Sequence, residues 1–187
     1  AARALLDDAP EIAKHIGVVV YGTSRLAGQG PNPSRSFALQ SGLPNHIPAH
    51  TITSACLSGV DALADARRRI LCGEALAVLV GSGESMSNTP RAMFPVSDDK
   101  NAFRYDDLHL RDGLLCPQTG LIMAEIAEAL AVKQGIRREH CDDYAIQSHT
   151  RANLNYALHK RSIVPINIAD KVIEYDQSLR KIGRAHV

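Results

Sequence analysis

The stretch "IGVVVYG", residues 16–22, decides how this chain folds, because it is rich in β-branched residues and carries no charge. An apolar run without polar alternation is typical of a strand that is buried on both faces of its sheet. Two segments of similar character follow it, "AHTITSA" at 49–55 and "ALAVLVGSG" at 75–83. The sequence therefore predicts a sheet that is covered by other elements on both sides.

Helical segments alternate with these strands. Residues 34–43, "SRSFALQSGL", have the composition of a short helix, and residues 57–72 carry apolar side chains at helical spacing. The apolar positions that we expect to face the core in this second helix are Val60, Leu63, Ala66, Ile70 and Leu71. The order strand, helix, strand, helix, strand over residues 16–83 predicts an α/β unit with parallel strands.

The rest of the chain divides by composition. Residues 1–15 have a short helical pattern that Pro10 interrupts. Residues 91–120 are polar and show little periodicity, which predicts a long irregular segment with a functional role. Two helices are expected after it, at 120–135 and 138–160.

Composition and charge narrow the class of protein. With 187 residues and 45% hydrophobic content, the chain can bury a core. The formal net charge is +1 and the basic residues are scattered, so no nucleic-acid partner is expected. No apolar run approaches the roughly 20 residues of a membrane-spanning helix, so no membrane is expected either.

The cysteines are spread along the chain, at positions 56, 72, 116 and 141. They form no CxxC pair and have no histidine at ligand spacing, so no metal site is expected. Free thiols in a chain of this size indicate a reducing compartment, and we expect the cytoplasm.

Cys56 stands in "TSACLSGV", residues 53–60, where an apolar segment passes into a helix. The start of a helix carries a partial positive charge that favours a thiolate over a thiol, and the thiolate is the nucleophile. Its small neighbours leave room for a substrate carbonyl. This pattern alone allows two interpretations: a nucleophile, or a small hydrophobic residue in the core.

Five stretches resemble signatures of the thiolase family, in the family's order. "ITSACLSGVDALADARRRI", 52–70, resembles the segment around the nucleophilic cysteine, and "GSGESMSNTP", 81–90, resembles a "GGMESMS" loop. "GQGPNPSRSFALQSGLP", 28–44, is similar to the segment that precedes the nucleophile strand. "RDGLLCPQTGLIMAEIAEALA", 111–131, and "GIRREHCDDYAIQSHTRA", 135–152, are similar to two later segments of the family.

The resemblance implies an α/β fold: the N-terminal half of a thiolase, with a layered mixed sheet, covering helices and a loop subdomain. Residues 1–90 would form the core domain, without the family's first strand, and residues 91–181 the loop domain that covers the coenzyme A site. The last six residues, "IGRAHV" at 182–187, match a translated sequencing adapter and are interpreted as an artefact.

The same resemblance implies an acyltransferase that acts on coenzyme A thioesters. Cys56 would be the nucleophile that carries the acyl group as a thioester, and Leu114 and Met123 would line the coenzyme A tunnel. Acyl-CoA and CoA would be the substrates, without a covalently bound cofactor. The reaction would be thiolytic cleavage of a 3-oxoacyl-CoA or condensation of two acetyl-CoA molecules; acyl chain length and direction stay open.

Other catalytic motifs of the family have no match in the 187 residues. These are the histidine of "GHP", the second cysteine of "CxGxG" and the asparagine of "NEAFA". We therefore expect this fragment to be inactive alone, and the full-length protein to be a homodimer or homotetramer. The alternative is a non-catalytic thiolase-like protein that binds CoA or acts by association.

A third hypothesis is a cysteine hydrolase, which would require a histidine and a carboxylate near Cys56. His46 and His50 precede the nucleophile strand, but we interpret them as structural. Glu84 is interpreted as a structural loop residue beside the nucleophile, and Cys116 as an incidental thiol. Three loop carboxylates without calcium-loop spacing are interpreted as solvated: Asp106, Asp107 and Asp112.

Overall fold

The computed structural model describes residues 1–97 and 99–180. The chain divides into two compact units, Ala2–Ile122 and a second unit that begins at Met123. The domain boundary expected between residues 90 and 91 stays a prediction. Residues 182–187, interpreted as an artefact, lie outside the described residues.

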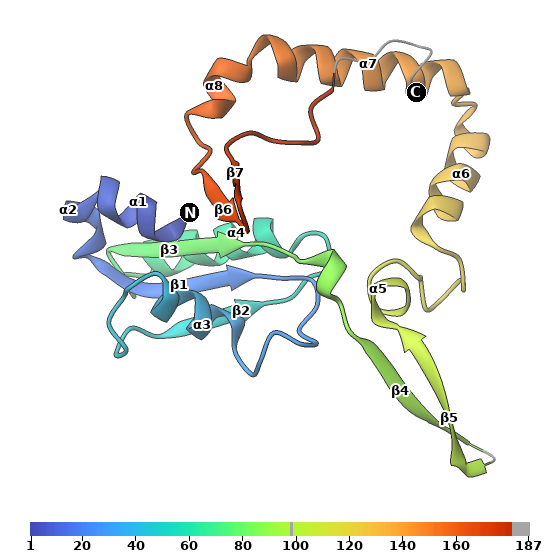
Figure 1. Cartoon of the computed structure of the whole chain (residues 1–187), viewed down its shortest axis with the longest axis horizontal. Helices are drawn as coiled ribbons and strands as arrows, with labels where there is room; N and C mark the ends of the chain where they lie inside the picture. The colour runs from blue at the N-terminus through green and yellow to red at the C-terminus, as the bar shows by residue number, and fades with distance from the viewer. Residues whose placement is uncertain (98, 181–187) are drawn as a thin grey trace. The chain divides into compact units, whose positions relative to one another are not determined.

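A three-stranded parallel sheet forms the centre of the first unit (Figure 1). Its strands are β1 (Ile16–Gly22), β2 (Ala49–Ile52) and β3 (Ala77–Ser82), in the order β2-β1-β3. The central place of β1 explains its sequence, because a strand with neighbours on both edges and helices on both faces meets no water. The predicted parallel α/β unit is confirmed.

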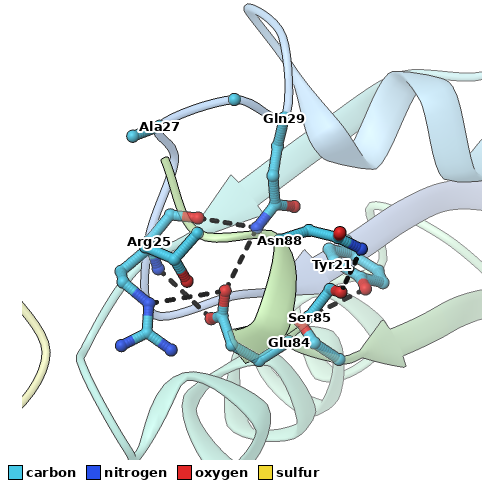
Figure 2. A pocket seen from close by; sticks show the side chains of 10 residues that line it. Tyr21, Arg25, Ala27, Gln29, Glu84, Ser85 and Asn88 are labelled. Carbon is cyan, nitrogen blue, oxygen red and sulfur yellow. Dashed lines mark hydrogen bonds and ion pairs between the residues drawn. The ribbon is translucent and has the colours of Figure 1, made fainter. Parts of the chain in front are cut away.

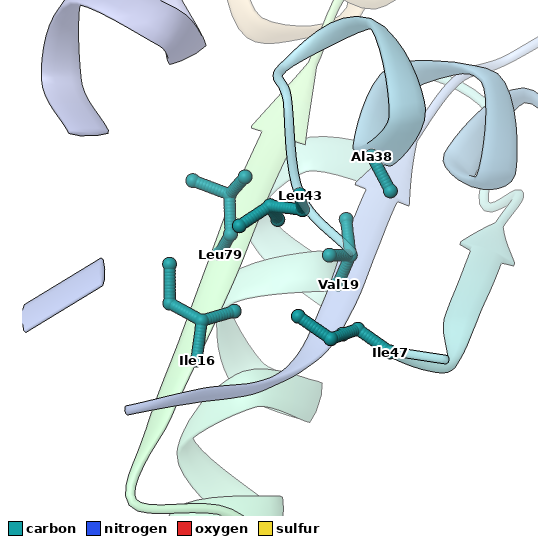
Figure 3. Packing of buried hydrophobic residues seen from close by; sticks show 6 residues of the cluster. All are labelled: Ile16, Val19, Ala38, Leu43, Ile47 and Leu79. Atoms are coloured by element: carbon teal, nitrogen blue, oxygen red, sulfur yellow. The ribbon is translucent and has the colours of Figure 1, made fainter. Parts of the chain in front are cut away.

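Helices cover the two faces of this sheet (Figure 1). On one face lies α3 (Pro33–Gln40), and Figure 3 shows its Ala38 beside Val19 of β1. The buried members of this cluster are Ile16, Val19, Ala38, Leu43, Ile47 and Leu79. On the other face lies α4 (Ser58–Leu71). The buried members of the second cluster are Val18, Val20, Ala62 and Ala75.

A β-bulge in β1 brings Ile16 onto the same face of the sheet as Val19. The pairing with β3 shifts register between Ile16 and Val18. Ile16 therefore shares a face with Val19, although strict alternation would place these two residues on opposite faces. Ahead of the strand, α1 (Ala2–Asp8) and α2 (Pro10–Ala13) form the predicted helical segment, with Pro10 at the start of the second helix.

The expected core face of α4 is wrong for most of its positions. Ala66 is buried, but the other buried residues of the helix are Ser58 and Ala62. The large apolar side chains expected in the core are exposed, at 64% for Val60, 61% for Leu63, 46% for Ile70 and 67% for Leu71. The residues of α4 that are buried against the sheet are thus small ones, a serine and two alanines. The unit thus presents an apolar helix face that it does not cover.

The segment expected to be irregular contains an antiparallel hairpin. A 3-10 helix (Met86–Asn88) leads into β4 (Arg91–Val96), which pairs with β5 (Asp99–Asp107), and α5 (Leu108–Arg111) follows. None of the hairpin's described side chains is buried. Without a buried face, these strands need no alternation of apolar and polar residues, so their sequence did not indicate them.

The second unit consists of helices and a small hairpin. Its helices are α6 (Met123–Gln134), α7 (Arg138–Leu154) and α8 (Tyr156–Lys160), and its strands are β6 (Ile166–Ile168) and β7 (Lys171–Ile173). The helix expected over 138–160 is interrupted at Asn155. In the part of the chain that the structure describes, no helix has the length and apolar character to cross a bilayer.

The end of β1 touches the start of α4, and this contact generates a stability prediction. A Cβ atom added at Gly22 would lie 2.4 Å from the Ser58 carbonyl oxygen and 2.9 Å from the Gly59 nitrogen. Because both neighbours are backbone atoms, Gly22→Ala should lower the free energy of unfolding by about 3 kcal/mol, the upper part of the overpacking range. Urea denaturation followed by circular dichroism measures this loss.

Gly17→Ala is the matched control in the same strand. Its added Cβ would meet the Ala75 Cβ at 3.2 Å and no backbone atom closer than 3.6 Å. This variant should lose roughly 1 kcal/mol or less. Equal losses for the two variants would contradict the proposed contact.

Candidate functional site

Cys56 lies in the connection between β2 and α4, as the sequence predicts. Its side chain is exposed, so the alternative of a buried core residue is wrong. The preceding Ala55 has φ of 50°, a left-handed conformation that costs a non-glycine residue about 1–3 kcal/mol. Leu57 caps α4, so the thiol stands one residue before the helix cap. A sharp turn thus holds the sulfur at the positive end of a helix.

The hydroxyl of Ser58 holds this turn together. Ser58 is 3% exposed, and its Oγ accepts a hydrogen bond from the Ser54 backbone N–H at 2.9 Å. The same hydroxyl lies 2.6 Å from the Ala55 carbonyl oxygen and 3.2 Å from the Thr23 carbonyl oxygen, both of which can accept its proton. Thr53 Oγ1 also donates to the Thr23 carbonyl, at 2.6 Å. These bonds fix the Cys56 turn to the segment that follows β1.

Cys56 and Leu114 line one cavity of about 330 Å³. Its other chemically active lining residues are Ser24, Arg25, Glu84, His109 and Asp112. The structure therefore brings together two of the three site residues expected from the sequence. Met123 begins α6 and belongs to the second unit, so its relation to Cys56 stays a prediction, as do the roles of all three residues.

Glu84 lies in the wall of this cavity and is bound by the loop after β1. Its Oε2 accepts hydrogen bonds from the Ser24 N–H at 2.8 Å, from the Ser24 hydroxyl, and from Thr23 Oγ1 at 3.1 Å. Its Oε1 accepts from Gln29 Nε2 at 3.3 Å (Figure 2). The interpretation of Glu84 as a structural loop residue agrees with this use of its carboxylate.

These contacts set the protonation of the Glu84 carboxyl group. Burial alone would raise its pKa, because a charged group loses hydration. The hydrogen bonds from Ser24 and Thr23, together with the Arg25 charge, outweigh burial and hold the pKa below its ordinary value. Glu84 is therefore an anion at neutral pH and is not a proton donor at this pH.

Arg25 is the site residue that sequence reasoning missed. It is 8% exposed, and its Nε lies 3.7 Å from Glu84 Oε1, beyond hydrogen-bond distance. Arg25 and Glu84 also line a second cavity of about 430 Å³, with Tyr21, Gln29 and Asn88 (Figure 2). Arg25 is a single cationic residue next to a glycine-rich turn, and the surrounding sequence has no periodicity that would predict its burial.

His109 was not singled out from the sequence either. It lies on α5, where its N–H donates to Asp107 Oδ1 at 2.8 Å, and the helix is anchored by the buried Leu108. The Nδ1 atom of the His109 ring is buried and has no hydrogen-bond partner among the described residues. No carboxylate of the described part of the chain bonds to this nitrogen, so the imidazole lacks the support that a catalytic triad supplies.

The remaining candidates lie away from the cavity or are paired. His46 and His50 are exposed and are not among the lining residues. Asp106 pairs with Arg111 at 2.7 Å, and Asp107 caps α5. Hydrogen bonds from Thr119 and Gln118 lower the pKa of Cys116. Among residues 1–97 and 99–180, no three His, Cys, Asp or Glu side chains gather as a metal site would require.

The Glu84 contacts predict a pH-dependent stability. Since the folded-state pKa lies below the unfolded value of about 4.3, the stabilisation is present above that pH and is lost as pH falls through the folded-state pKa. Glu84→Gln should lower the free energy of unfolding by roughly 2 kcal/mol at pH 7. The difference from wild type should shrink below about pH 4. Urea denaturation at several pH values measures it.

Glu11→Gln is the control, because the Glu11 side chain is 82% exposed and pairs only with Lys14 on the surface. It should change stability by less than about 0.5 kcal/mol at any pH. A Glu84→Gln difference that stays constant from pH 7 to pH 3 would contradict the assignment.

Comparison with known proteins places this geometry in a family. The family model for "Thiolase, N-terminal domain" matches residues 1–184. Acetyl-CoA acetyltransferase of Candida albicans is 32% identical over 199 residues, covering 99% of this chain and 49% of that protein. The chain thus spans about half the length of the curated relatives it matches.

Solved structures agree with the sequence match. The acetyl-CoA acetyltransferase of Syntrophomonas wolfei superposes with a TM-score of 0.88 at 33% identity, over 100% of this chain and 48% of that one. Human mitochondrial 3-ketoacyl-CoA thiolase in complex with CoA gives 0.87 at 28% identity, over 100% of this chain and 49% of that one. The chain belongs to the thiolase family, to whose N-terminal domain it corresponds.

Proposed function

We propose that this chain is the N-terminal half of a thiolase that transfers acyl groups between coenzyme A thioesters through Cys56. One observation carries the proposal: an exposed thiol on a strained strand-to-helix turn opens into a cavity. The positive end of α4 stabilises negative charge at this position. The names of the related proteins, acetyl-CoA acetyltransferase and 3-ketoacyl-CoA thiolase, agree with such a reaction.

The reaction proceeds in two half-reactions. The Cys56 thiolate attacks a carbonyl carbon of the acyl-CoA, the acyl group becomes a thioester of Cys56, and a CoA species leaves. Free CoA, or a second acyl-CoA, then takes the acyl group and regenerates the thiolate. The first outcome is thiolytic cleavage of a 3-oxoacyl-CoA, and the second is condensation of two acetyl-CoA molecules.

Coenzyme A binds along the residues after the hairpin. Leu114 is in the Cys56 cavity, where its partly exposed side chain offers an apolar contact to the pantetheine chain. Met123 continues the coenzyme A tunnel, and the loop domain at 91–181 covers the bound molecule. Acyl-CoA and CoA are therefore the ligands of this chain.

A second half of the protein completes the site. Helix α4 leaves Val60, Leu63 and Leu71 more than 60% exposed, an apolar face suited to a further layer of structure. That second half supplies the base, the second cysteine and the oxyanion asparagine, and the complete protein is a homodimer or homotetramer. The four cysteines are free, which favours a reducing compartment, the cytoplasm.

A cysteine hydrolase is less well supported. The Cys56 cavity does contain His109, but the Nδ1 atom of this residue has no carboxylate partner. The carboxylate of Glu84 also lines this cavity, but it accepts hydrogen bonds from Ser24 and Thr23. A thiolase needs neither group for its nucleophile, so the acyl-transfer proposal is the better account of the cavity.

Cys56→Ser in the complete protein should abolish the acyl-enzyme while the fold stays intact, because the change in volume is small and a serine hydroxyl is a far weaker nucleophile. Mass spectrometry of protein quenched during reaction with acetoacetyl-CoA measures the acetyl adduct. Cys72→Ser, at the end of α4, is the control and should keep the adduct. An adduct that survives Cys56→Ser would refute Cys56 as the nucleophile.

The isolated 187-residue chain should show negligible thiolysis of acetoacetyl-CoA, at least about 100-fold below the complete protein, because it lacks the general base, which contributes about 10²–10⁴-fold. Loss of absorbance of the magnesium–acetoacetyl-CoA complex measures the rate. Circular dichroism shows whether the chain is folded. Turnover comparable to that of the complete protein would overturn the expectation, and a complete protein that binds CoA without turnover would favour the non-catalytic alternative.

A further inference from the structure

We propose that Arg25 selects acyl-CoA substrates whose short acyl group ends in a carboxylate, by binding that carboxylate in the Cys56 cavity. This inference rests on the proposed function for the coenzyme A thioester as the ligand. It adds the substrate class, which neither the family match nor the nucleophile determines. Three observations support it: the burial of Arg25, its unused donors and its place in the cavity wall.

The burial of Arg25 is unusual for a cation. Its side chain is 7% exposed, a level that arginine reaches in proteins only when its charge is paired. None of the hydrogen bonds among the described residues has the Arg25 guanidinium as its donor. The buried nitrogen without a hydrogen-bond partner is Nε, and an unsatisfied buried donor is costly. The two terminal nitrogens carry the other four of the five N–H groups, and a ligand that accepts from them supplies hydrogen bonds that the described residues do not.

Glu84 does not use up the guanidinium. The Glu84 oxygens accept hydrogen bonds from Thr23, Ser24 and Gln29, and their closest contact with the guanidinium is 3.7 Å, to Nε. Figure 2 shows the two terminal nitrogens of Arg25 directed away from the Glu84 carboxylate. Glu84 thus holds one edge of the guanidinium by charge and leaves the other edge for a ligand.

The free edge of Arg25 lies against the residues that follow α5. A Cβ added at Gly113 would lie 2.0 Å from Arg25 Nη1 and 2.6 Å from the His109 carbonyl oxygen. Gly113 therefore makes room for the guanidinium, and Gly113, Arg25 and Cys56 line the same cavity. Arg25 thus belongs to the wall of the cavity that an acyl group on Cys56 would enter.

A carboxylate is the ligand group that fits this wall best. The planar guanidinium presents parallel N–H groups whose spacing matches the two oxygens of a carboxylate. The cavity, about 330 Å³, is at the small end of ligand sites. Asp112, the other acidic residue of the lining, is half exposed and lies 3.7 Å from Arg111, which also pairs with Asp106 at 2.7 Å.

The test compares two acyl-CoA probes that share every atom except the group at the acyl end. Succinyl-CoA ends in a carboxylate, and butyryl-CoA ends in a methyl group on the same length of chain. Binding is measured by isothermal titration calorimetry to the complete gene product in a Cys56→Ser background, which prevents acyl transfer to the thiol. The background protein should bind succinyl-CoA at least about 10-fold more tightly than butyryl-CoA.

Arg25→Met should remove this preference while leaving butyryl-CoA affinity within about two-fold. The double variant Arg25→Met/Glu84→Gln should do the same without leaving Glu84 as an unpaired buried anion, so it guards against misfolding. Arg25→Lys should keep only part of the preference, because lysine lacks the planar pair of donors. Arg91→Met is the control, because Arg91 is exposed on β4 and forms no ion pair among the described residues. This variant should keep the full preference for succinyl-CoA.

The outcomes separate the two proposals. A succinyl-CoA preference that Arg25→Met abolishes supports the role of Arg25, even if the complete protein shows no thiolysis and the proposed function fails. Equal affinity of the background protein for both probes, binding of neither, or a preference that survives both Arg25 variants would overturn it, even if acetoacetyl-CoA is cleaved.

Discussion

The close approach of β1 to the start of α4 is the constraint on which the rest of this half-site depends. Gly22 allows the strand end to touch the Ser58 backbone, and the Ser58 hydroxyl joins the turn at Ala55 to the Thr23 carbonyl. These contacts use no side chain larger than serine. As a result, the nucleophile candidate and the loop after β1 are positioned by the same few atoms, and both line one cavity.

A buried pair of opposite charges, Arg25 and Glu84, makes part of the wall of this cavity polar. Glu84 organises the loop by accepting hydrogen bonds from Thr23 and Ser24, while the Arg25 guanidinium donates none to the described residues. Charged groups are expensive to bury, and a structure retains them where they contribute something that apolar packing does not. On the proposed role of Arg25, the contribution is a charged group in the wall of the cavity that Cys56 also lines, which a purely aliphatic acyl pocket would not need.

Much of the fold followed from the sequence, because burial imposes a pattern. The β1 run "IGVVVYG" predicted a central strand, and Cys56 was expected at the strand-to-helix passage where the structure has it. The hairpin of β4 and β5 gave no such signal, since neither of its faces is buried. The core face of α4 was predicted wrongly because large apolar side chains were expected to be buried, whereas the structure buries the small residues Ala62 and Ala66.

The site was less predictable than the fold. Arg25 and His109 are ordinary residues by composition, and only the packing of distant segments makes one buried and leaves the other with an unpaired nitrogen. Family resemblance supplied Leu114 and Met123; Leu114 lines the same cavity as Cys56, and Met123 begins the second unit. Residues that act through long-range proximity leave no local signature, unlike a nucleophile that needs small neighbours on either side.

The bare face of α4 also bears on how the protein is made. If the proposed second half covers Leu63 and Leu71, which are exposed in this unit, that cover is synthesised after them. Each further 100 residues take about 5–20 s to translate. During this interval the exposed apolar face of α4 can associate with neighbouring nascent chains. Production of this protein should thus depend on chaperones that shield the helix during elongation.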